Sequence, residues 1–560
     1  MTATLLAIAG LGAMFLGFRF YSAFIADKIY RLDPTFVTPA HAMHDDKDYV
    51  PTHRLVLWGH HFTAVAGAAP IIGPAIAVIW GWVPAFLWVV FGTIFFAGVH
   101  DFGAIWASVR NKGQSIGALT GAVVGHRSRL LFMIVIFLLL LMVNAVFAVV
   151  IARELMAMPS AVIPTWSAVA VALVIGVLIY KVKVGILWPT IVGTVILYAV
   201  IYLGEVVPVT LPAQFLGLSA GTQWILILFL YAGIASMLPV WLLLQPRDYI
   251  NGIQLIVGLG LLYAAVLYAN PAVVAPAFNL AVPAGTPSLL PLLFVTVACG
   301  AVSGFHGLVG SGTTSKQLDK ETDARFVGYL GSLGEGALAL IAIIATTAGF
   351  ASIEEWRGTY SSFAGGGVGS FVNGGGSILA QAGLPLAFGK TLLTVMAILF
   401  AGTTMDAGVR LQRYIVQEWG EIYRIRALQN GHVATLLAVG SCLLLAFGAG
   451  GGGTGGMVIW PLFGTTNQLL AGMTLLVLSV ILVRLGRPAR YTLVPMVFVT
   501  SMAFLSAVYQ LWSLYTAGNY LLVGLDLLII VAAVWVMLEA AGALVAARDS
   551  ARTSRDDSPN

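Results

Sequence analysis

GHHFTAVAGAAPIIGP, residues 59–74, places two histidines and several helix-breaking residues inside an apolar stretch that is long enough to enter a membrane. Its histidines are His60 and His61, and its breakers are Gly67, Pro70, Gly73 and Pro74. In hydrocarbon every backbone N–H and C=O group needs a partner inside the protein, so a lipid-facing helix gains nothing from such residues. Interrupted spans of this kind often mark binding sites in secondary transporters. The stretch therefore predicts a binding site.

The whole chain has the composition of a membrane protein. Of its 560 residues, 59% are hydrophobic and 9% are charged, and the mean hydropathy is +0.95. A membrane span needs roughly 20 apolar residues, and we expect about fifteen such spans. They lie near 3–25, 55–79, 83–108, 128–151, 163–180, 184–203, 222–243, 253–270, 288–310, 325–349, 378–403, 433–448, 457–483, 491–514 and 519–546. The sequence indicates an all-α polytopic membrane protein.

The basic residues alternate along the chain. Of the 28 Lys and Arg residues, 24 lie beside every second predicted loop. The positive-inside rule explains this alternation and places the N-terminus outside and the C-terminal tail in the cytoplasm. The net charge of +5 therefore reflects membrane orientation, and nucleic acid is excluded as a partner. Both cysteines, Cys299 and Cys442, fall inside predicted spans without metal or redox spacing, so we expect packing roles and no cofactor.

A second broken helix is expected in the span 222–243, which contains LYAGIASMLPVWLLLQP with Gly233, Ser236 and Pro239. By the loop charges this span runs opposite to 55–79, as a five-plus-five inverted repeat of the leucine-transporter kind requires. We therefore expect an N-terminal helix and cytoplasmic segment at 1–54, a ten-helix transport core at 55–407, and C-terminal helices with a short tail at 408–560. Substrate-binding residues are then expected at both breaks: His60, His61, Gly67, Ala68, Gly73, Tyr231, Gly233 and Ser236.

Ionisable side chains inside spans are costly enough to be functional candidates. We expect proton coupling to involve His61, Asp101, Glu335 and Asp406, with one of the two adjacent histidines facing the site. Structural alternatives stay open, since Asp101 could pair with a histidine or Arg110 and Asp406 with Arg410.

Two further segments carry polar groups at helix ends. SGFHGLVGSGTTSK (303–316) holds Ser311, Thr313 and Thr314, which could coordinate Na⁺ or cap the helix. His306 in the same segment, with Asn467 and Gln468 in WPLFGTTNQ (460–468), is expected to support a gate or to make structural helix contacts. The glycine-rich stretches 364–377 and 448–456 lack the strand and lysine of a phosphate loop, and we expect flexible outer loops or gates there.

The chain resembles the carbon starvation protein A family of bacterial inner-membrane transporters. The resemblance is carried by segments in the family's order: TPAHAMHDDKDYVPT (38–52), LWGHHFTAVAGAAPIIGP (57–74), VHDF (99–102), PVWLLLQPRDYIN (239–251), ACGAVSGFHGLVGSGTTSK (298–316), ETDARFVGYL (321–330), DAGVRLQRY (406–414) and WPLFGTTNQLLAGM (460–473). It implies uptake of pyruvate or peptides driven by an ion gradient. It also implies kinship with the amino acid–polyamine–cation superfamily and its ten-helix inverted-repeat core.

Together these features predict a secondary active transporter rather than an enzyme. We expect it to import pyruvate or a similar small carboxylate by proton symport with alternating access. The alternatives are a peptide or amino-acid importer of the same fold and coupling to Na⁺ instead of H⁺. The expected partners are a small-molecule substrate and membrane lipids.

Overall fold

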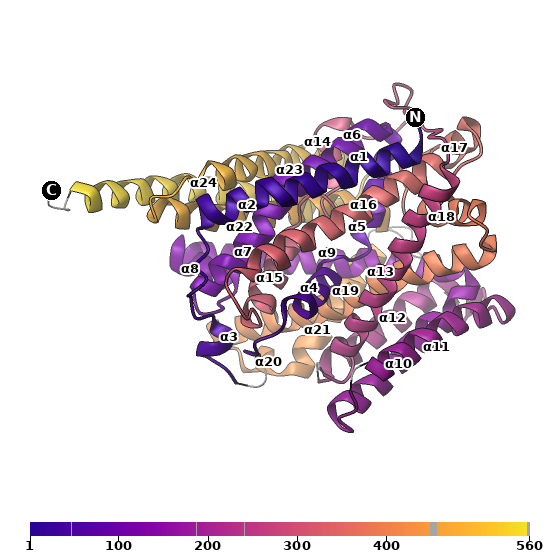
Figure 1. Cartoon of the computed structure of the whole chain (residues 1–560), viewed down its shortest axis with the longest axis horizontal. Coiled ribbons are helices and arrows are strands. Elements are labelled where there is room, and N and C mark those ends of the chain that lie inside the picture. The colour runs from indigo at the N-terminus through magenta and orange to yellow at the C-terminus, as the bar shows by residue number, and fades with distance from the viewer. Residues whose placement is uncertain (46–47, 186, 240, 449–455, 557–560) are drawn as a thin grey trace.

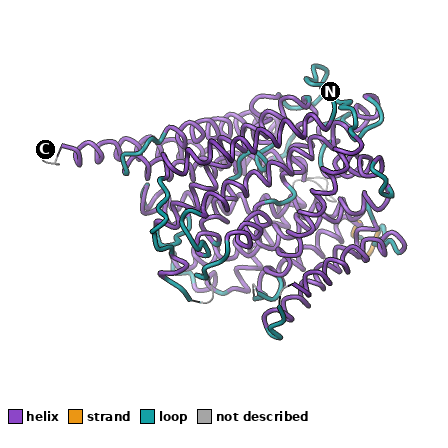
Figure 2. Tube along the Cα trace, in the orientation of Figure 1, coloured by secondary structure: helices purple, strands orange, loops and turns teal. Residues whose placement is uncertain are grey.

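The computed structural model describes residues 1–45, 48–185, 187–239, 241–448 and 456–556. Nearly all of these residues are helical, and most helices run along one common direction (Figures 1 and 2). A short hairpin of β1 (Gln214–Phe215) and β2 (Leu218–Ser219) is the only sheet in this part of the chain. The N-terminus and the end of α24 lie at opposite ends of the molecule (Figure 1).

Before the second interruption described below, the helices are α1 (Ala3–Leu16), α2 (Ser22–Phe24), α3 (Pro39–Ala42), α4 (Arg54–Val65), α5 (Ala69–Ala77), α6 (Trp82–Gly92), α7 (Gly98–Arg110), α8 (Ile116–Val123), α9 (His126–Ala157), α10 (Val162–Tyr180), α11 (Leu187–Val206), α12 (Ala220–Met237) and α13 (Leu244–Ala269). The later helices are α14 (Leu289–Thr296), α15 (Gly304–Gly312), α16 (Leu330–Ala348), α17 (Ile353–Thr359), α18 (Val368–Gln381), α19 (Leu386–Ile422), α20 (Arg426–Gln429), α21 (Gly431–Gly448), α22 (Gly456–Arg484), α23 (Arg490–Thr516) and α24 (Tyr520–Asp556).

Thirteen helices of the described chain are long and apolar enough to cross a membrane. Each coincides with one of the fifteen spans expected from the sequence. The two remaining spans, 55–79 and 288–310, are each split into two shorter helices. The chain is therefore a multi-pass helical membrane protein, while the exact number of crossings stays a prediction.

The first interruption lies where the sequence predicts it. Helices α4 and α5 are bent by 53° relative to each other. Between them Ala66 has φ −76° and ψ 73°, outside the helical region, and the N–H of Gly67 donates to Val65 O at 2.9 Å. Because Pro70 lies in the first turn of α5, where its missing N–H removes no helical bond, the second half-helix starts cleanly there.

The second interruption lies between α14 and α15, at residues 297–303. Gly300 in this linker has φ +92°, a conformation that side chains with a Cβ rarely adopt. The expected break in the span 222–243 does not lie at Gly233 or Ser236, since α12 runs unbroken through both to Met237. The helix stops just before Pro239, where Leu238 is extended with φ −69° and ψ 151°.

The two broken helices run antiparallel with their breaks side by side. At one end, Thr52 N donates to Gln317 O at 3.0 Å, just before α4 and just after α15. At the breaks, a Cβ on Gly73 would lie 2.4 Å from Thr296 O. An inverted pair requires this arrangement. The five-plus-five repeat and the boundaries of the expected domains at 54 and 407 stay predictions.

The glycine-rich stretch 364–377 is ordered, contrary to the expectation of a flexible loop. It forms a short turn and most of α18, which packs against α16 and α19. A Cβ on Gly374 would lie 2.0 Å from Ala345 O, so glycine allows this close helix contact. Most of the stretch 448–456 lies outside the described residues.

Candidate functional site

Four helices bring ionisable side chains together in the middle of the protein. His61 comes from α4, Asp101 from α7, His306 from α15 and Glu335 from α16. Each of these residues is at most 1% exposed. Burying four such groups is expensive unless they bind one another, so their convergence defines a candidate site, which we call the histidine–carboxylate cluster.

Asp101 lies at the centre of the histidine–carboxylate cluster. Its Oδ1 lies 2.7 Å from His100 Nδ1, and its Oδ2 lies 2.8 Å from His306 Nδ1. Ser332 Oγ donates to the same Oδ2 at 2.6 Å. A carboxyl group facing three donors is best satisfied as a carboxylate, so Asp101 provides a fixed negative charge between the helices.

His306 connects Asp101 to Glu335. Its Nε2 lies 3.2 Å from Glu335 Oε2. The distance suits an ion pair, but the angle is too poor for a hydrogen bond. His306 Nε2 therefore has no hydrogen-bond partner among the described residues. The Glu335 Oε1 atom also has no partner among the described residues. Glu335 is therefore the more weakly held carboxyl group, and the contact is better described as electrostatic.

This geometry can store one exchangeable proton. If Glu335 is ionised, His306 as an imidazolium faces a carboxylate on each side. If Glu335 takes up a proton, its negative charge disappears while Asp101 keeps its three partners. The second state differs from the first by one proton and one unit of charge, which is what a coupling site must provide.

The His61 side chain is separate from the Asp101–His306–Glu335 chain but adjoins it. Its Nδ1 lies 2.9 Å from Thr314 Oγ1, and its ring packs against Gly331 on α16. His60, the neighbouring residue, is only partly buried. Successive residues of a helix point about 100° apart. The structure thus places His61, and not His60, toward α15 and α16.

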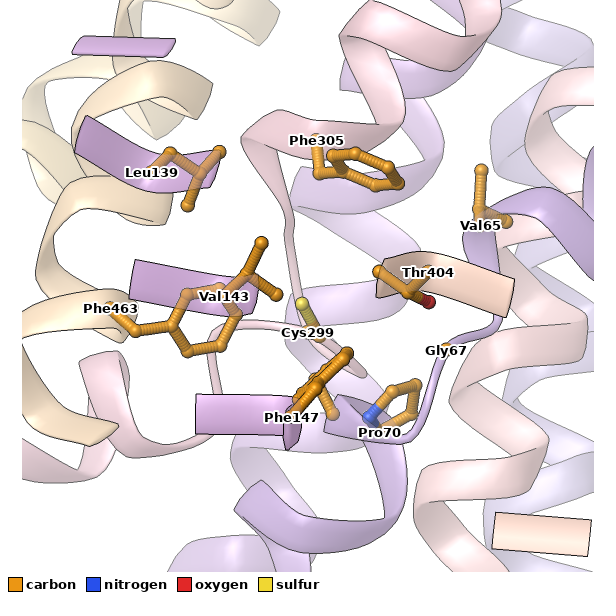
Figure 3. A pocket seen from close by; sticks show the side chains of 11 residues that line it. Val65, Gly67, Pro70, Leu139, Val143, Phe147, Cys299, Phe305, Thr404 and Phe463 are labelled. Atoms are coloured by element: carbon orange, nitrogen blue, oxygen red, sulfur yellow. The ribbon is translucent and has the colours of Figure 1, made fainter. Parts of the chain in front are cut away.

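A small cavity lies beside the cluster, at the level of both breaks. Figure 3 shows its lining side chains around the linker that carries Cys299 and the break at Gly67. The lining residues are Val65, Gly67, Ala69, Pro70, Leu139, Val143, Phe147, Cys299, Phe305, Thr404 and Phe463. The cavity volume is about 20 Å³, which leaves room for about one water molecule. Binding anything larger requires the helices to move apart.

The cavity and the cluster share two helices. Val65 lines the cavity one turn after His61 on α4, and Phe305 lines it next to His306 on α15. Both α5 and α15 begin at the cavity, with Ala69 and Phe305 in their first turns. Helix N-termini carry partial positive charge, so two such ends at one cavity favour an anion there.

The family model for carbon starvation protein CstA matches residues 2–355 and 352–507. The chain belongs to the carbon starvation protein CstA family. A peptide transporter CstA of Campylobacter jejuni is 33% identical and covers 93% of this chain and 82% of its own length. A peptide transporter CstA of Bacillus subtilis is 32% identical over 88% of this chain and 87% of its own length. A pyruvate/proton symporter BtsT of Escherichia coli is 31% identical over 87% of this chain and 78% of its own length.

These CstA-family relatives are transporters, and this chain is accordingly a transporter rather than an enzyme. Among solved structures, a manganese transporter of Eremococcus coleocola matches 87% of this chain and 95% of its own. Its identity of 12% and TM-score of 0.40 are too low to support details of the fold.

Not every residue expected at the substrate site of this CstA-family protein lines the cavity. Gly67 lines it, and Ala68 caps α5 at the break. Gly73 packs against the backbone of α14 instead. On α12, Gly233 faces α21, whereas Tyr231 contacts Asp406. The structure therefore separates the α12 residues, Ser236 included, from the cavity.

Asp406 lies in a second buried cluster and not with the histidines. Its Oδ2 accepts hydrogen bonds from Tyr231 OH at 2.8 Å and from Arg247 Nη1. The expected alternative partner, Arg410, instead donates to Ala235 O and Leu238 O at the end of α12. Sequence reasoning thus found a functional candidate but assigned it the wrong neighbours. Likewise Arg110 pairs with Glu321 rather than with Asp101.

The three hydroxyl groups after α15 do not converge. Ser311 Oγ accepts from Ile116 N at 2.9 Å, Thr314 contacts His61, and Thr313 is exposed. Asn467 supports the second break, because its Oδ1 accepts from Phe305 N at 3.1 Å and its Nδ2 donates to Ser303 Oγ at 3.0 Å. Gln468 donates to Phe294 O at 3.0 Å, on the other side of the same break.

Sequence reasoning missed several residues at the site. Ser332 gives no signal in a single sequence, since serine is common in helices. Phe305 and Thr404 look like ordinary membrane-span residues until the fold places them at the cavity. His100, in contrast, is already a candidate from the sequence, because it is an ionisable residue inside a span and directly precedes Asp101.

Proposed function

We propose that this CstA-family protein imports pyruvate or a similar small carboxylate together with a proton. The single observation that carries the proposal is the cavity at which two half-helices begin, next to the histidine–carboxylate cluster. The positive ends of α5 and α15 would bind the carboxylate. The similarity to the pyruvate/proton symporter BtsT supports this assignment.

Glu335 would bind the proton, and His306 and Asp101 would provide the neighbouring charges that set its affinity for the proton. Protonation from the outside would remove one buried negative charge beside the cavity. An entering carboxylate would then meet less repulsion, so proton and substrate would favour each other's binding. Reciprocal coupling of this kind is what symport requires thermodynamically.

We expect an entrance from the outside of the membrane next to the cavity. A second hollow of about 190 Å³ is lined by Ile72, Val150, Arg153, Glu154 and residues 365–370. Ile72 and Val150 lie on α5 and α9, each three residues from a cavity-lining residue, Ala69 and Phe147 respectively. The loop charges support an outside location for this hollow and a cytoplasmic C-terminus. We place the protein in the bacterial inner membrane with its N-terminus outside.

A peptide importer is the second candidate, favoured by the relatives named peptide transporter CstA. The small cavity favours a substrate of few atoms. A peptide would need a larger opening of the helices and a counter-charge for its ammonium group. The buried carboxylates of the histidine–carboxylate cluster would have to serve that purpose.

Uptake by the purified protein in liposomes separates these candidates. Labelled pyruvate should accumulate when the outside is acidic, with or without sodium, and unlabelled di- and tripeptides should not compete. Accumulation of a peptide without pyruvate uptake would replace the first candidate by the second. Uptake that depends on sodium at constant pH would identify Na⁺, and not H⁺, as the coupling ion.

A further inference from the structure

A second buried polar region lies away from the histidine–carboxylate cluster, along one face of α13. It is formed by Arg247, Asp248, Asn251 and Gln254, which we call the α13 stripe. Asn251 lies four residues after Arg247 and three after Asp248, and Gln254 lies three residues further on, so the four side chains fall on one side of the helix. They are between 0% and 7% exposed. So continuous a row of buried polar groups in a membrane helix indicates a function.

The near end of the α13 stripe is an ion-pair network with α12 and α19. Arg247 Nη1 donates to Asp406 Oδ2 and, at 2.6 Å, to Tyr231 OH. Further along, Asn251 Nδ2 donates to Thr403 Oγ1 at 2.7 Å. Thr403 directly precedes Thr404, which lines the cavity. The stripe therefore extends from the charged network to the residue next to the cavity wall.

Many polar atoms of the α13 stripe have no partner among the described residues. They are Arg247 Nε, Asp248 Oδ1, Asn251 Oδ1 and both amide atoms of Gln254, and Asp406 Oδ1 opposite them is also unpartnered. Buried polar atoms in proteins are nearly always hydrogen-bonded to protein or to ordered water. Donors and acceptors occur here side by side, which suits water, because each water molecule donates and accepts.

We propose that the α13 stripe holds a chain of internal water molecules through which protons pass to the cytoplasm, with Asp248 as its proton-binding residue. A proton reaching Asp248 through water forms an O–H bond at the carboxylate. That bond breaks when the proton moves to the next water toward the cytoplasm. The carboxylate is then restored, and no other reactant is needed. This inference rests on the proposed proton symport.

Several groups set the charge around Asp248. Arg247 lies next to it on α13, and Asp406 faces it from α19. Tyr231 on α12 is a further titratable side chain that interacts with Asp248. Arg247 is hydrogen-bonded to Asp406, and among the described residues no cation forms an ion pair with Asp248, whose Oδ1 has no partner.

The decisive variant is Asp248→Asn in the full-length protein in liposomes. Exchange of labelled for unlabelled pyruvate requires no net proton movement, so we expect its rate to stay within about twofold of wild type. Accumulation driven by an imposed proton gradient should fall at least about tenfold, as expected when a proton-transfer group is removed. Asp248→Glu should restore most of the accumulation.

A matched control is Asp526→Asn. Asp526 is also fully buried, and both its oxygens are unpartnered in the described structure, but it lies on α24, away from the stripe. We expect it to leave both exchange and accumulation unchanged. A second test is Gln254→Leu, which breaks no hydrogen bond with a described residue. If the stripe only packs, this variant is neutral, whereas a water chain predicts at least about a threefold loss of accumulation, since the waters lose polar partners.

Normal accumulation in Asp248→Asn, or equal losses of exchange and accumulation, would overturn the proton pathway and leave the proposed symport intact. Absence of gradient-driven uptake in the wild type would overturn the symport, and the pathway with it. The two failures are therefore distinguishable.

Discussion

His61 Nδ1 lies 2.9 Å from Thr314 Oγ1, and this contact joins the first half of one broken helix to the end of the other. Both residues are fully buried. Any motion that separates α4 from α15 has to break this contact in a medium without water to replace it. The contact therefore holds α4 against the segment that follows α15.

The two adjacent histidines should differ sharply when each is replaced by glutamine. His61→Gln loses the ring that contacts Thr314 and packs on Gly331, and we expect uptake to fall at least about tenfold, the equivalent of roughly 1.4 kcal/mol. His60→Gln changes a partly buried side chain on another face of α4 and should stay within about twofold. Uptake assays in liposomes at matched protein density measure both. Equal effects of the two variants would contradict the assignment of His61 to the interface.

Glu335→Gln should mimic a permanently protonated carboxyl group. The amide keeps the size and removes the charge, so substrate exchange should continue while accumulation driven by a proton gradient falls at least about tenfold. The dependence of exchange on pH should also flatten, because the titrating group is gone. Uptake and exchange measured across a pH series test this prediction. A variant that accumulates pyruvate normally would remove Glu335 from the coupling role.

Most of the helical spans could be predicted from the sequence, because apolar length is a local signal. The first break was predictable for the same reason, since Pro70 and Gly67 are conspicuous within an apolar run. The second break was not, because its linker contains no proline and its key residue, Gly300, is one glycine among small residues. Gly233 and Ser236 gave a stronger sequence signal, yet α12 absorbs both within a regular helix.

The partners within each cluster could be predicted only in part: a histidine was one of the two partners expected for Asp101, but the sequence did not show which histidine. Asp101, His306 and Glu335 are more than 200 positions apart at their extremes, and a single sequence holds no information on which spans touch. Asp406 illustrates the consequence. An acidic side chain near the end of a predicted span indicated a function. Only the packing of α19 on α12 and α13 places Asp406 with Arg247 rather than with the histidines.

Close packing of the two breaks should make Gly73 intolerant of a side chain. In Gly73→Ala the new Cβ would meet Thr296 O at 2.4 Å, so α5 and α14 must separate. We expect a loss of about 1–3 kcal/mol in stability. The matched control is Gly59→Ala, because no atom lies within 4 Å of a Cβ at that position. Thermal unfolding of the two variants in detergent compares them, and an unshifted Gly73→Ala transition would contradict the side-by-side breaks.

Cys299 should report the opening of the cavity. It lines the cavity and is 9% exposed, whereas Cys442 is fully buried on α21. Both thiols donate a hydrogen bond, that of Cys299 to Ser303 Oγ and that of Cys442 to Gln412. In a Cys442→Ser background, a membrane-permeant maleimide should therefore react with Cys299 slowly at rest. Pyruvate with an inward proton gradient should raise that rate at least about fivefold, since reactivity follows the population of open forms. The converse variant, Cys299→Ser with Cys442 retained, should stay unreactive under both conditions. Labelling followed by mass spectrometry measures both, and a Cys299 rate that does not respond to substrate would contradict a cavity that opens during transport.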